Sequence, residues 1–256
     1  MKENENNAII KTDMLCKSYV SDGEVNHVIK NMNLNIQDHD FTVIMGASGS
    51  GKSTLLYVLC GMLEATSGEV DFDGACITKL KEGKMAAFRR DTLGFVFQNI
   101  NLIPDLNVLE NIICPAYGTK RPMEETVQKA QKLMTKLDLE GQEKKFPEQL
   151  SGGQRQRVAI CRALINQPKV LFADEPTGAL NSTQGKHVLD IFSKLNQQGQ
   201  SVVMVTHDLK AALRGKRIIY IRDGRIDGEL SLPDYEEQDI EEREKCVFSF
   251  LKEHGF

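Results

Sequence analysis

The chain has 256 residues, 41% of them hydrophobic, enough to bury the core of one large domain or of a domain with a subdomain. Its 32 Lys and Arg against 36 Asp and Glu give a net charge of −4, without the basic excess of a general nucleic-acid binder. No apolar run approaches the roughly 18 residues of a membrane span, and residues 1–11 lack the apolar region of a signal peptide. We therefore expect a soluble cytoplasmic chain whose six cysteines, none in a C-x-x-C pair, are reduced core thiols.

Residues 9–72 contain short apolar runs that alternate with polar residues, which predicts an antiparallel sheet at the start of the chain. Four other runs are nearly continuous in apolar residues and end abruptly, as buried strands of a parallel sheet do. They are FTVIM at 41–45, GFVF at 94–97, VLFA at 170–173 and VVMVT at 202–206. Because ligands of open α/β sheets bind beyond the carboxyl ends of the strands, the residues that follow these runs are expected to form one site.

The first of these strands leads into GASGSGKST, which fits the phosphate-binding pattern G-x-x-x-x-G-K-[ST] between a strand and a helix. In this pattern backbone N–H groups ring the phosphates, Lys52 reaches the β- and γ-phosphates, and the Ser53 hydroxyl binds Mg²⁺. The alternative is a glycine turn with a surface lysine, which the flanking strand and helix disfavour. The residues expected to contact the nucleotide are Gly46, Ala47, Ser48, Gly49, Ser50, Gly51, Lys52, Ser53 and Thr54.

The other three strands are followed by side chains suited to hydrolysis of a nucleoside triphosphate. Asp174 would hold Mg²⁺ through water and Glu175 would polarise the attacking water, although adjacent carboxylates after a strand also serve as helix caps. His207 would contact the γ-phosphate, and the alternative is a satisfied core or capping histidine. Gln98 is weak evidence when taken alone, because an ordinary surface amide would leave the same pattern.

Two further segments have a helical pattern. In residues 107–141, TVQKAQKLMTKLDL places apolar residues three or four positions apart and predicts a helical subdomain. After residue 228 the chain turns acidic and closes with an amphipathic segment, for which we expect one apolar helical face. The members of that expected face are Ile240, Val247, Phe248 and Leu251.

A second glycine-containing segment, LSGGQ at residues 150–154, stands immediately before a helix. No strand precedes it, and it has no lysine at the spacing of the first loop, so it cannot be a second independent nucleotide site. It can still offer a phosphate the Ser151 hydroxyl and the backbone N–H groups of Gly152, Gly153 and Gln154.

LSGGQ, together with GASGSGKST, VLFADEP, Gln98 and His207, resembles the ATP-binding subunit of an ATP-binding cassette (ABC) transporter. The resemblance covers roughly residues 9–228. It implies an α/β fold: a P-loop NTPase core with a parallel sheet (9–97 and 158–228), an N-terminal antiparallel β subdomain and an inserted α-helical subdomain (about 98–157). Residues 229–256 are then an acidic C-terminal tail with an amphipathic helix.

The resemblance also implies ATP and Mg²⁺ as ligands and two cassettes paired head to tail. LSGGQ of one copy then caps the ATP held by the P-loop, GASGSGKST at residues 46–54, of the other copy. Glu175, His207 and Gln98 become catalytic, and Ser53, Gln98 and Asp174 become metal-binding. Tyr19 resembles the aromatic residue that stacks on adenine, with a buried strand tyrosine as the alternative. One departure is Asn181, at a position where the family has Asp.

ADEPTGALNS and SYVSDGEVNHVIKNMNL are most similar to the group that serves macrolide export, lipoprotein release and bacitracin-type peptide resistance. This implies a homodimer docked on a separate integral membrane permease at the cytoplasmic face of the membrane. The substrate moved would be amphiphilic, and a peptide antibiotic is one candidate. The alternatives are a soluble cassette ATPase that acts on ribosomes or DNA, and a scaffold that binds ATP without hydrolysing it.

Overall fold

A computed structural model describes residues 7–21 and 23–255. The chain divides into two compact units. Unit 1 comprises Met1–Met85 and Ser201–Phe256, and unit 2 comprises Ala86–Gln200. Helix α2 (Glu82–Thr92) crosses the boundary between them.

The antiparallel sheet predicted near the N-terminus is present in unit 1. Strand β1 (Ala8–Ser21) pairs antiparallel with β2 (Glu24–Met32), β3 (Asn35–Gln37) and β5 (Ser67–Phe72). Strand β5 also pairs with the short β6 (Ala75–Cys76). From Ile10 to Asp13, buried and exposed residues of β1 alternate, as the period-two pattern predicts for a strand with one face on the core, and Ile9 is buried as well.

Unit 1 also contains a group of parallel strands. Strand β4 (Phe41–Met45) lies between β9 (Ser201–Val205) and β10 (Arg217–Arg222), parallel to both, and β11 (Arg225–Ser231) pairs antiparallel with β10. Every residue of β4 and β9 is buried, which explains their continuous apolar sequences. Helix α1 (Lys52–Leu59) follows β4, and the short α7 (Leu209–Ala212) follows β9.

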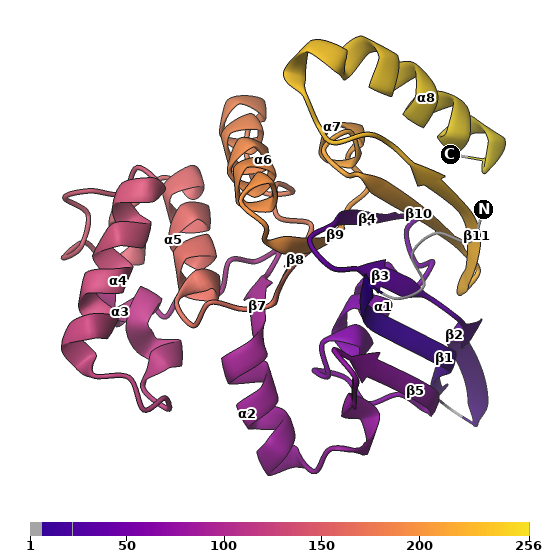
Figure 1. The fold of residues 1–256 in the computed structure, drawn as a ribbon, viewed down its shortest axis with the longest axis horizontal. Helices are drawn as coiled ribbons and strands as arrows, with labels where there is room; N and C mark the ends of the chain where they lie inside the picture. The colour runs from indigo at the N-terminus through magenta and orange to yellow at the C-terminus, as the bar shows by residue number, and fades with distance from the viewer. Residues whose placement is uncertain (1–6, 22, 256) are drawn as a thin grey trace. The chain divides into compact units, whose positions relative to one another are not determined.

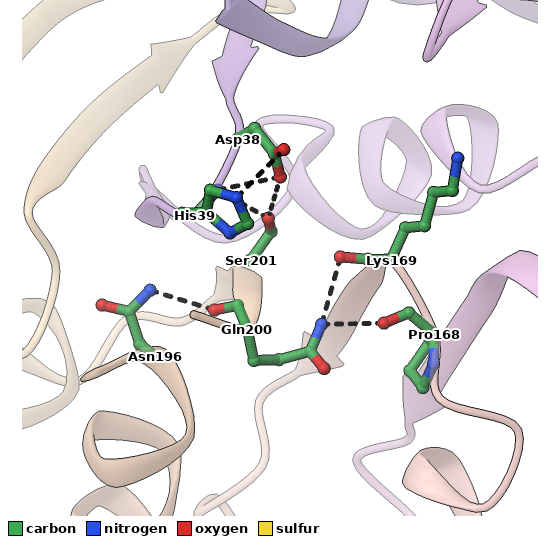
Figure 2. A network of polar contacts seen from close by, with 7 residues as sticks. All are labelled: Asp38, His39, Pro168, Lys169, Asn196, Gln200 and Ser201. Atoms are coloured by element: carbon green, nitrogen blue, oxygen red, sulfur yellow. Dashed lines mark hydrogen bonds and ion pairs between the residues drawn. The ribbon is translucent and has the colours of Figure 1, made fainter. Parts of the chain in front are cut away.

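Hydrogen bonds fix the chain where β4 and β9 begin, at the end of these strands away from the P-loop (Figure 2). The buried Ser201 hydroxyl donates to Asp38 Oδ1 at 2.7 Å and accepts the backbone N–H of His39 at 2.8 Å. Within unit 2, the side-chain amide of Gln200 donates to the carbonyl oxygens of Pro168 and Lys169, both at 3.1 Å. These contacts hold the strand starts in place and serve the fold.

The C-terminal helix α8 (Ile240–Glu253) packs on its own unit. Arg243 is 3% exposed and donates to the carbonyl oxygens of Leu213 and Gly215. The predicted helical face is correct for the buried Val247 and Leu251 but wrong for Phe248, which is 61% exposed, and its fourth member, Ile240, is half-buried. The reason is helical geometry: the buried positions are 243, 247, 250 and 251, a stripe that excludes residue 248.

Unit 2 pairs β7 (Leu93–Val96) parallel with β8 (Val170–Asp174). Helices α3 (Val108–Ile113), α4 (Met123–Lys136) and α5 (Gly152–Leu164) pack against one another, and α6 (Ser182–Gln197) contacts α5 (Figure 1). The helical pattern predicted for residues 107–141 is thus confirmed. Among the apolar residues that lie three or four positions apart in this segment, Ala130, Met134 and Leu137 are buried, while Val127 and Leu133 are half-buried.

The cysteines only partly match the expectation of core thiols. All six are free, but only Cys60 and Cys161 are buried, and Cys246 is exposed on α8. Burial raises the pKa of the Cys161 thiol. Across residues 7–21 and 23–255, none of the helices has the length and apolar character needed to cross a membrane.

Candidate nucleotide-binding and hydrolysis site

The P-loop connects β4 to α1 in the geometry of a phosphate-binding loop. Gly51 is the N-cap of α1, with φ +99°, and no side chain caps the helix. A Cβ built on Gly51 would lie 2.8 Å from the carbonyl oxygen of Val28, so only glycine fits here without displacing the backbone. Helix α1 therefore begins at the loop without a side-chain cap and carries the partial positive charge of a helix N-terminus there.

The polar side chains of this loop fit a phosphate ligand. Lys52 is 9% exposed, and its Nζ donates to the carbonyl oxygens of Gly46 and Ala47, both at 2.8 Å, so the ammonium lies over the loop. The hydroxyl oxygen of Ser50 is buried and makes no hydrogen bond with any described residue. A buried hydroxyl without a partner is costly, and an oxyanion bound in the loop would supply one.

His207 follows β9 at the same sheet edge as the P-loop. Strands β4 and β9 are parallel, with Ile44 opposite Val205, and the N–H of Thr206 donates to the Ile44 carbonyl at 3.2 Å. The His207 side chain is exposed. The cap of α7 is Asp208, whose carboxylate accepts the N–H of Lys210. His207 is therefore neither a core histidine nor this cap.

Tyr19 lies on β1, opposite Asn26 of β2, and is 43% exposed. Tyr19 is therefore a strand residue but not a buried one, contrary to the alternative. The same hairpin reaches the P-loop through the Val28 carbonyl beside Gly51. The Nζ of Lys17 lies 5.1 Å from the centre of the Tyr19 ring. An exposed ring on this hairpin can stack on a planar base.

Unit 2 gathers the other polar residues expected at strand ends. Asp174 ends β8 and is 3% exposed; Glu175 follows, 9% exposed, with φ +44°. A Cβ built on Gly178 would lie 3.6 Å from Gln98 Nε2 and 3.8 Å from the Cβ of Glu175, so Gln98 and Glu175 flank the same glycine. The cap of the following helix α6 is Asn181. Asp174 and Glu175 are therefore not the caps of the helix that follows them, which was the alternative reading of adjacent carboxylates after a strand.

LSGGQ forms the start of α5. Ser151 is its N-cap in a capping box: its hydroxyl accepts the N–H of Gln154 at 3.3 Å, and Gln154 Oε1 accepts the N–H of Ser151 at 2.9 Å. Gly152 and Gly153 are already helical and pack on the start of α6. A Cβ on Gly153 would lie 3.1 Å from Cγ of Gln184. A cavity of about 180 Å³ opens between the starts of α5 and α6.

Two residues that hold loops of this unit in place, Asn111 and Arg162, were not predicted from the sequence. Asn111 is fully buried, and its amide donates to the carbonyl oxygens of Ile103, Leu106 and Asn107. Arg162 binds the chain just after Gln98. Each of them is a polar residue inside an apolar helical run, VLENII for Asn111 and ICRAL for Arg162. This pattern could have indicated a buried polar side chain that needs hydrogen-bonding partners.

The comparisons with known proteins agree with this geometry. A family model described as ABC transporter matches residues 29–178, more than half of the chain. The chain belongs to the ABC transporter family. This ABC cassette has the predicted α/β fold with parallel strands and is the ATP-hydrolysing cassette of a transporter.

Among relatives of this ABC cassette, the ATP-binding protein MJ0796 of Methanocaldococcus jannaschii is 41% identical over 235 residues, 90% of this chain and 100% of that protein. The macrolide export ATP-binding/permease protein MacB of Mannheimia succiniciproducens is 44% identical over 209 residues. That match covers 81% of this chain and 32% of MacB, so the cassette spans about a third of that relative.

Solved structures give the same assignment for the ABC cassette. A dimeric structure of MJ0796 matches with a TM-score of 0.81 at 42% identity, covering 88% of this chain and 100% of that one. A second dimeric structure of MJ0796, in a post-hydrolysis state with ADP and Pi, matches equally well. CbiO1 of Clostridium perfringens, part of the complex cbiONQ, matches with a TM-score of 0.80 at 27% identity, covering 95% of this chain and 92% of that one.

Proposed function

We propose that this ABC cassette forms a head-to-tail homodimer around two Mg·ATP and drives a separate integral membrane permease from the cytoplasmic face of the membrane. The observation that carries the proposal is the pairing of Gln98 with Glu175 around Gly178 in the unit that also presents LSGGQ. A water-polarising carboxylate and a segment that contacts phosphate then belong to the same unit. The dimeric structures of MJ0796 support the assembly, and the fusion of ATPase and permease in MacB supports the partner.

In this proposal residues Gly46 to Thr54 hold the phosphates and Tyr19 stacks on adenine. Ser53, Asp174 and Gln98 would hold Mg²⁺ directly or through water, and the bound ion would supply neutralisation of charge on the phosphates. LSGGQ of the second copy closes over the γ-phosphate with its hydroxyl and backbone N–H groups. Each chain thus uses its two glycine loops for two different nucleotides.

The chemistry is in-line attack of water on the γ-phosphorus, which forms one P–O bond and breaks the bond to the β-phosphate oxygen. Glu175 accepts a proton from the attacking water, which contributes about 10²- to 10⁴-fold. His207 hydrogen-bonds a γ-phosphate oxygen. Positioning and neutralisation of charge supply most of the remaining rate enhancement.

The permease partner would carry the substrate contacts, and an amphiphilic substrate such as a peptide antibiotic is our proposal from the MacB-like relatives and the GALNS segment. Asn181 serves here as the N-cap of α6, its side-chain oxygen accepting the N–H of Gln184 at 2.9 Å. Asn keeps this hydrogen bond and lacks the charge that Asp has in the family, so communication between the two sites of the dimer would differ.

The test is Glu175→Gln in the full chain. Hydrolysis should slow by about two to four orders of magnitude, the scale of a lost general base, while ATP binding persists. The variant should accumulate as an ATP-bound dimer in size-exclusion chromatography. The matched control is Glu140→Gln, an exposed glutamate of the same unit, which should retain wild-type turnover. Near wild-type hydrolysis by Glu175→Gln would contradict the proposal.

A further inference from the structure

The loop after Gln98 has an unusual backbone. Ile100 and Asn101 are consecutive residues with φ of +61° and +51°, in the left-handed region that L-residues rarely occupy. Isoleucine is especially disfavoured there, because its branched Cβ crowds the backbone. Such a conformation persists only where the surroundings hold it, so contacts to this loop control its position.

Arg162, in the last turn of α5, makes those contacts. Its Nη2 donates to the Ile100 carbonyl at 2.8 Å and its Nη1 donates to the Asn101 carbonyl at 2.6 Å. The planar guanidinium thus holds both left-handed peptides with one rigid fork. Burial lowers the pKa of Arg162, and the guanidinium forms no ion pair with the described residues. The two carbonyl oxygens are therefore its hydrogen-bonding partners.

A second side chain fixes the same loop farther along. The amide of Asn111 in α3 accepts the N–H of Ile103 at 2.8 Å and donates to three carbonyl oxygens between Ile103 and Asn107. These bonds span eight residues or fewer, so they set the internal shape of the loop. The bonds of Arg162 span about sixty residues and tie the loop to another element.

That element is the helix that LSGGQ begins. Helix α5 has 13 residues and is about 20 Å long, with Ser151 as its N-cap and Arg162 in its last turn. Helices of this length move as rigid rods. Any change in the position of LSGGQ is therefore passed through Arg162 to Ile100 and Asn101, and from there to Gln98, whose Nε2 lies next to Gly178 and Glu175.

We propose that Arg162 is a positioning residue for ATP hydrolysis, which couples the position of LSGGQ to that of Gln98. The inference rests on the proposed function, in which Gln98 acts on the metal or the attacking water and LSGGQ closes on a γ-phosphate. Arg162 itself does not touch the reacting atoms. It places Gln98 correctly when α5 has moved into its ATP-bound position.

The test is Arg162→Lys in the full chain, measured as steady-state Mg·ATP hydrolysis. Lysine keeps the charge and loses the two-pronged fork. We expect kcat to fall about tenfold, because a displacement of about 1 Å at a catalytic group is worth up to 10²-fold, while KM for ATP stays within about twofold. Hydrogen exchange at residues 99–103 should accelerate, because the loop loses its anchor.

The matched control is Arg121→Lys. Arg121 also donates from its guanidinium to a main-chain carbonyl of the same unit, that of Ile165 at 2.9 Å, but at the end of α5 instead of in the Gln98 loop. It should leave kcat within about twofold and exchange at 99–103 unchanged. Equal losses of kcat in the two variants, tracking only their melting temperatures, would overturn the inference. If Arg162→Lys does not fold, Arg162→Met is compared with Arg121→Met in the same way.

A double variant separates this inference from the proposed function. If Arg162 acts through Gln98, adding Arg162→Lys to Gln98→Ala should lower kcat by less than about twofold further. Full multiplication of the two effects would overturn the role of Arg162 and leave that of Gln98 intact. An unchanged kcat in Gln98→Ala would instead contradict the role of Gln98 in the proposed function, and the inference would fail with it.

Discussion

The two glycine loops of this chain use glycine for different physical reasons. In the P-loop Gly49 and Gly51 have φ of +78° and +99°, and α1 begins without a side-chain cap. In LSGGQ both glycines are helical, and α5 begins with a complete capping box from Ser151 and Gln154. The P-loop needs conformations that other residues avoid, whereas LSGGQ needs the absence of a Cβ where α5 meets α6.

This difference matches the two proposed tasks. Helix α1 after the P-loop begins without a side-chain cap, which suits the proposed binding of phosphates by the same chain. In LSGGQ the N–H groups of Ser151 and Gln154 are satisfied by the side chains of the same two residues, and in the proposed dimer this capped helix start would face the second chain. A loop that holds a ligand alone and a loop that closes on a ligand held elsewhere can therefore be told apart by how their helices are capped.

The largest expected effect comes from mixing two inactive variants, Lys52→Ala and Ser151→Arg. Each homodimer has two defective sites, but a heterodimer has one site with both defects and one site with an intact lysine and an intact serine. Random exchange should restore about a quarter of the wild-type sites, because half of the dimers are heterodimers with one good site each. Trapping of a labelled nucleotide, together with ATPase activity, reports the recovery.

If each chain used both of its own loops, every site in the mixture would remain damaged. No recovery of trapping or activity, with heterodimers shown by pull-down of differently tagged chains, would contradict the shared site. The different capping of the P-loop helix and the LSGGQ helix would then not reflect two different tasks.

The second effect concerns the conformation of the P-loop. Gly51→Ala places a Cβ 2.8 Å from the Val28 carbonyl at φ +99° and should destabilise the chain by about 3 kcal/mol. In thermal unfolding this corresponds to a fall in melting temperature of roughly 6–12 °C. Gly83→Ala is the control, since its Cβ meets no atom within 4 Å and its φ is not positive. Equal melting temperatures would show that the P-loop does not depend on this glycine.

The third effect tests the contact between α5 and α6. Gly153→Ala puts a Cβ 3.1 Å from Cγ of Gln184, and overpacking of this kind costs about 1–3 kcal/mol. In a Gln184→Ala background the contacts with Cγ and Cδ are gone and only the Cβ of residue 184, at 3.3 Å, remains, so the cost should fall toward zero, helped by the better helix propensity of alanine. Urea unfolding of the wild type, the two single variants and the double variant gives the coupling energy between residues 153 and 184. Additive effects would contradict the packing of Gly153 on Gln184.

The smallest effect is the loss of the second loop's cap. Ser151→Ala removes the hydroxyl that accepts the Gln154 N–H and should cost about 1 kcal/mol, or about 2–4 °C in melting temperature. Ser182→Ala, at the first position of α6 after its cap Asn181, is the matched control and should be neutral. A loss in Ser182→Ala as large as in Ser151→Ala would mean that the capping box does not stabilise α5.

Local patterns in the sequence determined much of this protein. The buried strands β4 and β9 are visible as unbroken apolar runs, because both faces of such a strand are covered. The P-loop and LSGGQ follow from short spacings that backbone chemistry requires. The α/β fold and the family could therefore be predicted without coordinates.

Long-range packing decided the rest. The exposure of Tyr19 and the contact of Gln184 with Gly153 are visible only in the folded chain. So is the buried face of α8, which includes Arg243 and leaves Phe248 exposed. The pairing of Arg162 with the strained loop after Gln98 joins residues about sixty positions apart. Sequence periodicity describes one element at a time, whereas these contacts depend on which elements pack together and at which residue they touch, so they could not be predicted from the sequence.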